Sequence, residues 1–253
     1  MAPFMSDSQT SHPPAPPANP LFLTTRWSVV LRAGRTDTTR AQTALAELCQ
    51  TYWYPLYAYA RRRGFSPEDA EDATQGFFEK LLRLGSLAGV EQAKGRFRAF
   101  LLASMKHFLA DERDHASAQK RDRARTISLD ARDAEERYRF EPVETATPEQ
   151  LFERRWALTL LDTVMQRLRA EYEDSGQAAL FAAARFAITG DKSAAPYTRL
   201  AAELGITGEA VRVAVHRLRR RYRQVLREEI AHTVADKSEI ADELNSLRRI
   251  LSA

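Results

Sequence analysis

The sequence contains a single cysteine, Cys49, among its 253 residues. An intramolecular disulfide and a cysteine-based zinc site both need more than one cysteine, so neither is expected. No apolar run reaches the roughly 18 residues of a membrane-spanning helix. No basic segment followed by an apolar stretch marks a secretion signal at the N-terminus. These absences predict a soluble cytoplasmic protein that does not associate with membranes.

Glycine is scarce and dispersed, with 10 residues, and none of them forms a glycine-rich phosphate-binding loop. The sequence also lacks the short motifs of serine hydrolases, zinc proteases and EF-hands. The 5 histidines are scattered along the chain. We therefore expect that the chain catalyses no reaction and binds no metal or other cofactor.

The chain is rich enough in apolar residues, at 44%, to build a packed core. Lysine and arginine number 38 against 34 acidic residues, a net charge of +4 that is too small to identify a polyanionic partner by itself. From Thr24 onward Ala, Leu, Arg and Glu dominate, and no convincing run alternates apolar and polar residues. This pattern predicts an all-α fold.

Composition divides the chain into five segments. Residues 1–23 are rich in proline and predict a disordered tail. Residues 24–125 are expected to form a first helical domain. Residues 126–146 carry an excess of acids and are expected to form an acidic solvated linker that contains a short helical piece at most. Residues 147–232 form a second helical domain that contains a helix-turn-helix. Residues 233–253 form a C-terminal helical extension.

Local signals mark the individual helices. Ser66 and Pro67 are typical of a helix start, as are Thr147 and Gln150. The helices are expected around 52–63, after Ser66, and over 97–114, 149–173, 177–188, 197–204, from Thr207, and over 238–251. Two apolar stripes at helical spacing predict core residues. These are Ala70, Ala73, Phe77, Leu81 and Leu84 in one helix and Phe97, Leu101, Met105 and Phe108 in the next.

Residues 197–221 read YTRLAAELGITGEAVRVAVHRLRRR, the pattern of a helix-turn-helix. Ala201 and Ala202 allow close helix contact, Gly205 allows the turn, and Ile206 is expected to be a buried plug. The second helix has one apolar face, formed by Val211, Val215, Leu218, Tyr222 and Val225. Between 211 and 227 it carries seven arginines and no acid. This cluster favours DNA binding over the alternative, a solvated basic helix in a structural bundle.

The segment EDAEDATQGFFEKLL over 68–82 places Asp72, Gln75 and Glu79 on one helix face, away from the Phe77 stripe. The face could dock a basic partner, or the acids could simply oppose the positive end of the helix dipole. A metal site built on Asp69 and Asp72 is disfavoured, because no second acidic cluster accompanies them.

Bases and aromatic residues are interleaved over 95–113, and bases continue over 120–125. This composition suits single-stranded nucleic acid, whose bases stack on aromatic rings and whose phosphates need cations. The stripe that begins at Phe97 is more simply core, whereas Phe100 and His107 lie off that stripe.

In this order, the segments resemble a bacterial RNA polymerase sigma factor of the extracytoplasmic-function type. Residues 52–63 resemble the family's region 2.1, residues 68–82 region 2.2, residues 95–113 regions 2.3 and 2.4, and residues 197–223 region 4.2. The resemblance covers about 48–125 and 147–230. The chain departs from the family's usual residues at Phe100, often Trp, and at His107, often Asn. It is also longer than usual between 147 and 196.

The resemblance implies binding to core RNA polymerase, through its β and β′ subunits, and to promoter DNA, with location at the nucleoid as part of the holoenzyme. The residues that match the polymerase-binding region are Asp69, Asp72, Gln75, Phe78 and Glu79. Those that match the contact with the −10 element are Arg98, Phe100, Lys106, His107 and Arg113. Those that match the −35 reading helix are Thr207, Glu209, Arg212, Val213, His216, Arg217 and Arg220.

Two other functions stay open at this point. A free-standing helix-turn-helix regulator would bind duplex DNA without replacing a sigma factor. A nuclease could use Asp69, Asp72 and Asp111. The sequence also leaves open whether an anti-sigma factor, or the C-terminal extension, holds the protein inactive.

Overall fold

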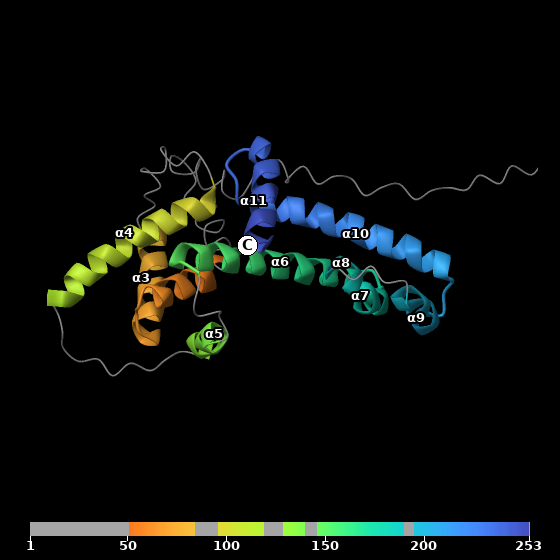
Figure 1. Ribbon diagram of the computed structural model, residues 1–253, viewed down its shortest axis with the longest axis horizontal. Coiled ribbons are helices and arrows are strands. Elements are labelled where there is room, and N and C mark those ends of the chain that lie inside the picture. Colours follow the sequence, from red (N-terminus) through yellow and green to blue (C-terminus); the bar gives the residue numbers. More distant parts are fainter. Residues whose placement is uncertain (1–50, 84–95, 119–128, 140–145, 190–194, 253) are drawn as a thin grey trace, which may run out of the picture.

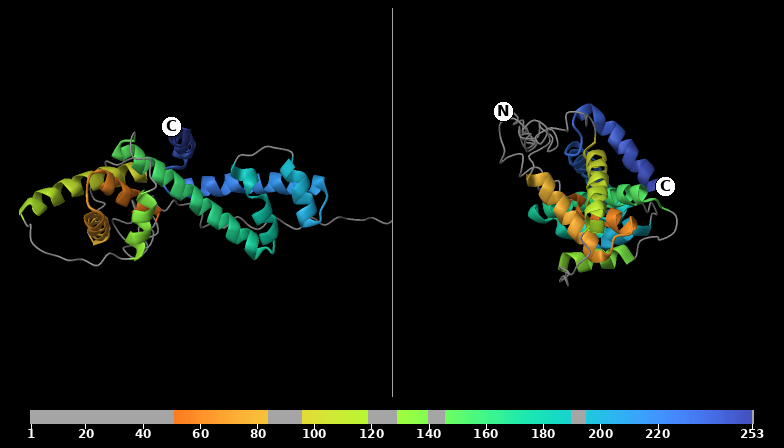
Figure 2. Two further views of the ribbon diagram at one scale, coloured as in Figure 1. Left: turned by 60° about the horizontal axis from the view of Figure 1, so that its bottom comes forward. Right: turned by 90° about the vertical axis from the view of Figure 1, so that its left-hand side faces the viewer.

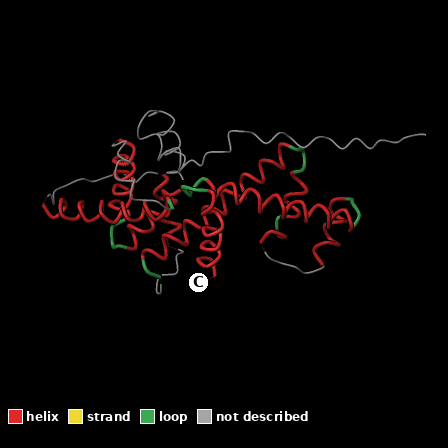
Figure 3. The backbone as a smooth tube through the Cα atoms, turned by 90° about the horizontal axis from the view of Figure 1, so that it is seen from above, coloured by secondary structure: helices red, strands yellow, loops and turns green. Residues whose placement is uncertain are grey.

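The computed structural model describes residues 51–83, 96–118, 129–139, 146–189 and 195–252. Every regular element in these ranges is helical (Figure 3), which confirms the all-α prediction for them. The predicted tail over 1–23, Leu84 and the basic residues over 120–125 lie outside the described residues. No helix in these ranges combines the length and apolar character needed to cross a membrane.

The molecule is elongated, and one long helix runs through its middle (Figure 1). A helix over 51–62 comes first. In chain order the next elements are α3 (Pro67–Arg83), α4 (Phe97–Ala118), α5 (Leu129–Arg139), α6 (Pro148–Asp174), α7 (Ala178–Ala184), α8 (Phe186–Thr189), α9 (Ala195–Leu204), α10 (Gly208–Ala231), the 3-10 turn η3 (Lys237–Glu239) and α11 (Ile240–Ser252). Helices α3, α4 and α5 occupy one end of the molecule, and α7 and α9 the other (Figures 1 and 2).

The predicted helix starts are confirmed by their caps. The Ser66 hydroxyl accepts a hydrogen bond from the Asp69 amide at 3.1 Å, just before α3. Thr147 and Gln150 form a reciprocal capping box at the start of α6, with bonds of 3.2 and 2.8 Å. Each cap satisfies backbone donors that have no partner within the helix, so these short motifs determine where the helices begin.

The first core joins the helix over 51–62, α3, α4 and the N-terminal half of α6, together with Ile230 of α10 and Leu247 of α11. The predicted stripes of α3 and α4 are buried in it at every described position except Leu81, which is half-buried. Tyr52 meets the edge of Phe97 with ring centroids 5.0 Å apart. This core therefore determines where α3 and α4 lie.

The segment expected to be a solvated linker contains α5, which packs against the first core. Ala134 is buried there at 3% exposure. Beside it, Glu135 accepts hydrogen bonds from Tyr57 Oη and from Arg61 Nε, both at 2.8 Å. The described part of this segment thus belongs to the first core.

A second core lies between the C-terminal half of α6 and helices α7 to α10. Leu160 of α6 belongs to the first core, and Val164, one turn later, belongs to the second. The two cores therefore meet inside α6, whereas the sequence placed a domain boundary just before Thr147.

Two finer predictions for the second half need correction. Ile206, expected to be a buried plug, is 39% exposed, because Leu200, Val211 and Val215 already fill the space behind the turn. Of the two alanines expected at the helix contact, Ala201 is half-buried against this core and Ala202 is exposed. The helix expected over 177–188 is divided at Arg185 into α7 and α8.

Candidate nucleic-acid interface

Helices α9 and α10 meet at a tight turn that fixes the start of α10. Gly205 has a φ of +63°, a left-handed conformation in which a side chain would be strained. The amide of Ile206 donates to the Ala201 carbonyl at 3.1 Å, and the Thr207 hydroxyl accepts from the Ala210 amide at 3.2 Å. The first turn of α10 therefore projects from the end of the molecule at a defined angle.

The residues that the sequence matched to −35 reading lie together on the outer surface of α10 and at its cap. These residues, all of them exposed, are Thr207, Glu209, Arg212, Val213, His216, Arg217 and Arg220. Val213 is a large apolar side chain that is 45% exposed among them. Within the described part of the chain, Arg212, Arg217 and Arg220 make no ion pair. Their guanidinium groups are available to an anionic partner.

Other arginines of the same cluster hold α10 in place. Arg219 donates to the Ala187 carbonyl of α8 at 2.7 Å. Arg221 donates to both carboxylate oxygens of Glu171 in α6, at 2.7 and 2.6 Å. The seven arginines thus include both exposed side chains and side chains that anchor α10 to the rest of the protein.

A second set of ion pairs also holds α10 to α6. Arg167 of α6 donates to Glu228 and, at 2.9 Å, to Glu229 of α10. The hydrogen bonds from Arg221, and then those from Arg167, lower the pKa of Glu171 against the opposing effect of burial. Glu171 is therefore a stable anion at neutral pH, and it keeps the two helices paired.

The residues matched to −10 contact lie on different faces of α4. Lys106 and His107 are exposed, and Phe100 is half-buried with its ring 6.3 Å from that of Phe97. Lys106 is paired at 2.9 Å with Glu149 of α6, whose hydrogen bond raises the pKa of the lysine. The side chain of Arg113 lies outside the described residues.

Arg98, assigned to DNA by the sequence, is only 4% exposed. Its guanidinium lies over the Trp156 ring at 4.6 Å and bonds Glu243 of α11 at 2.7 Å and Glu153 of α6 at 2.5 Å. Burial alone would lower the pKa of Arg98, but the hydrogen bonds and charges of Glu243 and Glu153 outweigh it and raise this pKa above its ordinary value. Sequence reasoning missed Glu153 and Glu243, because they lie 55 and 145 residues away along the chain.

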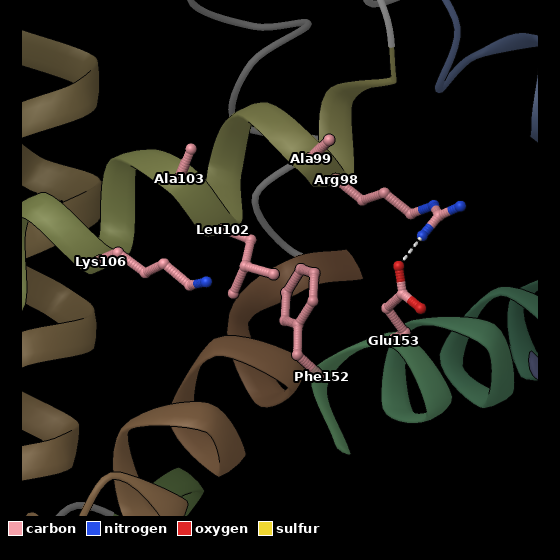
Figure 4. Close-up of a pocket in the computed structure, with 7 residues that line it drawn as sticks. All are labelled: Arg98, Ala99, Leu102, Ala103, Lys106, Phe152 and Glu153. Atoms are coloured by element: carbon pink, nitrogen blue, oxygen red, sulfur yellow. Dashed lines mark hydrogen bonds and ion pairs between the residues drawn. The ribbon is translucent and has the colours of Figure 1, made fainter. Parts of the chain in front are cut away.

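A small cavity of about 200 Å³ lies between α4 and α6 (Figure 4). Leu102 and Phe152 line its middle, and Arg98 and Lys106 lie along its length on α4. Each of the two cations is paired with a carboxylate of α6, Glu153 for Arg98 and Glu149 for Lys106. In this structure, acidic residues of the same chain hold both cations.

The α3 residues matched to polymerase binding are only partly on the surface. Asp69, Gln75 and Glu79 are exposed, and Asp72 is half-buried. Phe78, in contrast, is 7% exposed and belongs to the first core, so it is not presented to a partner. The exposed part of this face is polar and acidic.

The three aspartates of the nuclease alternative do not gather into a metal site. Asp69 accepts a hydrogen bond from the Ser66 hydroxyl at 2.8 Å, and Asp111 on α4 lies 3.9 Å from Lys80 of α3. Among the residues that the structure describes, no three His, Cys, Asp or Glu side chains are arranged to hold a metal ion.

Comparisons with known proteins add no relative. No protein family model, no curated protein and no solved structure matches this chain. The functional argument is therefore made from the surfaces of α3, α4 and α10 themselves.

Proposed function

We propose that the chain is a bacterial sigma factor of the extracytoplasmic-function type. It would bind core RNA polymerase, direct it to specific promoters and assist promoter opening. In this proposal the helices around the first core form the polymerase-binding and −10 part, and α9 and α10 form a DNA-binding helix-turn-helix for the −35 element. The chain catalyses nothing itself, because the polymerase carries out the chemistry.

The observation that carries the proposal is the outer surface of α10. Its exposed residues combine arginines that make no ion pair in the described chain with one apolar side chain, Val213. The major groove of DNA admits a helix, and there arginine pairs with guanine and an apolar side chain meets the thymine methyl group. Phosphate contacts from neighbouring arginines would set the position of the helix in the groove.

The exposed face of α3 supports the polymerase part of the proposal. Asp69 and Glu79 present carboxylates and Gln75 an amide on one helix that the first core holds firmly. An acidic face on a rigid helix is complementary to a basic partner surface, and such complementarity governs register and association rate. A regulator that acts alone has no need of this face.

Titration of the labelled chain with purified bacterial core RNA polymerase tests the proposal. Asp72 is half-buried, so charge reversal there could disturb the fold, whereas Glu79 is exposed. We expect saturable binding by the wild type and affinity about tenfold weaker or worse for Glu79→Arg, since like charges across an interface repel. The matched control is Asp174→Arg, an exposed acid at the far end of α6 that should bind as the wild type does.

Absence of polymerase binding by a folded wild-type chain would refute the proposal. The α10 surface would then favour the second candidate, a helix-turn-helix regulator that binds duplex DNA without polymerase. Measured affinity for duplex DNA in the absence of polymerase, together with dimer formation in solution, would support that candidate.

A further inference from the structure

The chain that follows α10 turns back onto the start of α4. Thr233 and Val234 are buried, and the Thr233 carbonyl accepts a hydrogen bond from the Phe97 amide at 3.0 Å. A capping box between Asp236 and Glu239 then shapes the turn through η3 into α11. These few residues shape the reversal, which places α11 against α6 and α10, near the start of α4 and the middle of the molecule (Figure 1).

Glu243 of α11 holds two arginines of α4. Its carboxylate is 0% exposed and accepts from Arg98 Nε at 2.7 Å and from Arg98 Nη2 at 3.1 Å. Arg96 Nε lies 2.7 Å from the same carboxylate. The Ser246 hydroxyl accepts from both arginines, at 3.2 Å from Arg96 and 2.9 Å from Arg98.

The contact between α11 and α4 is polar, through the buried Glu243 and Ser246. The rest of α11 is held to the first core by apolar side chains, which are the buried Leu247 and the half-buried Ile240, Leu244 and Ile250. A buried ion pair adds little net stability, because desolvation of both charges offsets their attraction. Its distinctive property is that a second anion can replace the first, and the two-pronged geometry that fits a carboxylate also fits a phosphate.

Helix α6 adds to the same arrangement. Glu153 bonds the remaining side of Arg98, and Glu149 pairs with Lys106 two turns further along α4. The cations of α4 therefore face carboxylates from two other helices. A strand of nucleic acid could reach Arg98 only after α11 had moved, because Arg98 is 4% exposed.

We infer that α11 is a built-in competitor of single-stranded DNA. Glu243 holds Arg96 and Arg98 where the phosphates of a strand would bind, and α11 leaves when the strand takes its place. The inference rests on the proposed function, in which α4 contacts the opened −10 strand, and it gives the C-terminal helix an autoinhibitory role.

The test compares affinities of full-length variants for a fluorescently labelled, short single-stranded DNA of mixed sequence at moderate salt. Glu243→Gln keeps the shape of the side chain and removes its charge, so the affinity should rise about tenfold as the covered state is lost. Asp242→Asn is the matched control, an exposed acid on the same helix whose neutralisation should leave the affinity unchanged. In the Glu243→Gln background, a further Arg98→Ala change should remove the gain.

Three results would overturn the inference. They are equal affinities for the Glu243→Gln and Asp242→Asn variants, weaker binding by Glu243→Gln, and no binding by any of them. Circular dichroism checks that each variant is folded.

A measurement on the wild type covers the case in which Glu243→Gln does not fold. Hydrogen exchange of the α11 amides should accelerate when a saturating amount of the same DNA is added. Unchanged protection of α11 in the saturated complex contradicts displacement. Polymerase titration stays a separate readout, because Glu79 and the α3 face are untouched. If the chain binds polymerase but shows neither the affinity gain of Glu243→Gln nor the faster exchange of α11, only the inference about α11 is overturned. If it shows these two effects but does not bind polymerase, the sigma proposal is overturned.

Discussion

Arg221 of α10 donates two hydrogen bonds to Glu171 of α6, from Nε at 2.7 Å and from Nη2 at 2.6 Å. Each oxygen of the carboxylate receives one nitrogen of the guanidinium. The pair joins residues 50 positions apart in the sequence, and Arg221 lies one turn after the exposed Arg217 of the same helix. One face of α10 is thereby tied to α6, which leaves the other face outward.

A double-mutant cycle on Arg221 and Glu171 should show this tie as a coupling energy. We expect about 1 kcal/mol, because the geometry is two-pronged but about a third of each side chain is exposed to solvent. Urea unfolding of the wild type, Arg221→Ala, Glu171→Ala and the double variant measures it. The same cycle on Arg169 and Glu173, an exposed pair within α6, should give a smaller value. Strictly additive losses at Arg221 and Glu171 would contradict the assignment.

The same carboxylate makes stability depend on pH. The hydrogen bonds from Arg221 hold the pKa of Glu171 below its ordinary value of 4.5 in the folded state. A lowered folded-state pKa adds stability above the unfolded-state pKa, and that stability is lost as the pH falls through the folded-state value. The wild type should therefore melt at a higher temperature than Glu171→Gln at pH 7, and the difference should shrink progressively as the pH falls below 4.5. A difference that persists unchanged in acid would contradict this origin.

Gly205 and Gly208 should respond oppositely to alanine. At Gly205 the φ of +63° makes Gly205→Ala strained, with an expected loss of about 1–2 kcal/mol in the free energy of unfolding. Gly208 is the first residue of α10, and open space surrounds the position of its Cβ. Gly208→Ala should therefore be neutral or stabilise by up to about 1 kcal/mol. Thermal unfolding of both variants measures the contrast, and equal effects would show that the turn does not depend on its backbone conformation.

Arg212 and Arg217 should matter for promoter recognition and not for folding. If either arginine pairs with a base, its replacement by alanine should weaken binding to the −35 element by about 1–3 kcal/mol. Transcription from a promoter shown to require its −35 element measures the loss. Arg185→Ala removes an exposed arginine just after α7 and serves as the control. Unchanged transcription in both α10 variants would refute the placement of this surface on DNA.

Helix starts and core stripes were predictable because they depend on residues within one or two turns. A serine or threonine cap needs only the amide three positions on, as at Ser66 and Thr147. The α4 stripe, from Phe97 to Phe108, is readable because apolar residues recur at three- and four-residue spacing. These features place most of the helices but say little about which of them touch.

The predictions that were wrong concern residues whose burial or ion pairing depends on a distant part of the chain. Phe78 lies on a second buried stripe of α3 with Glu71 and Thr74, and their mixed polarity hid the helical spacing. Arg98 looked like a surface cation because its carboxylate partners come from α6 and α11. A basic residue predicts a need for an anion, but it does not say whether the anion belongs to DNA or to the same chain.

Helix α6 runs through both cores, with Phe152 and Trp156 in the first and Val164 and Leu168 in the second. Its 27 residues make a rod of about 40 Å. Melting of either core would remove the packing of half the rod, and an unsupported half-helix is barely stable in water. Heat should thus unfold the described protein in one cooperative transition. Helix α10 also reaches both cores, through Val225 and Ile230, so the halves can separate on a partner only if α6 gives way between Leu161 and Val164 and α10 gives way as well.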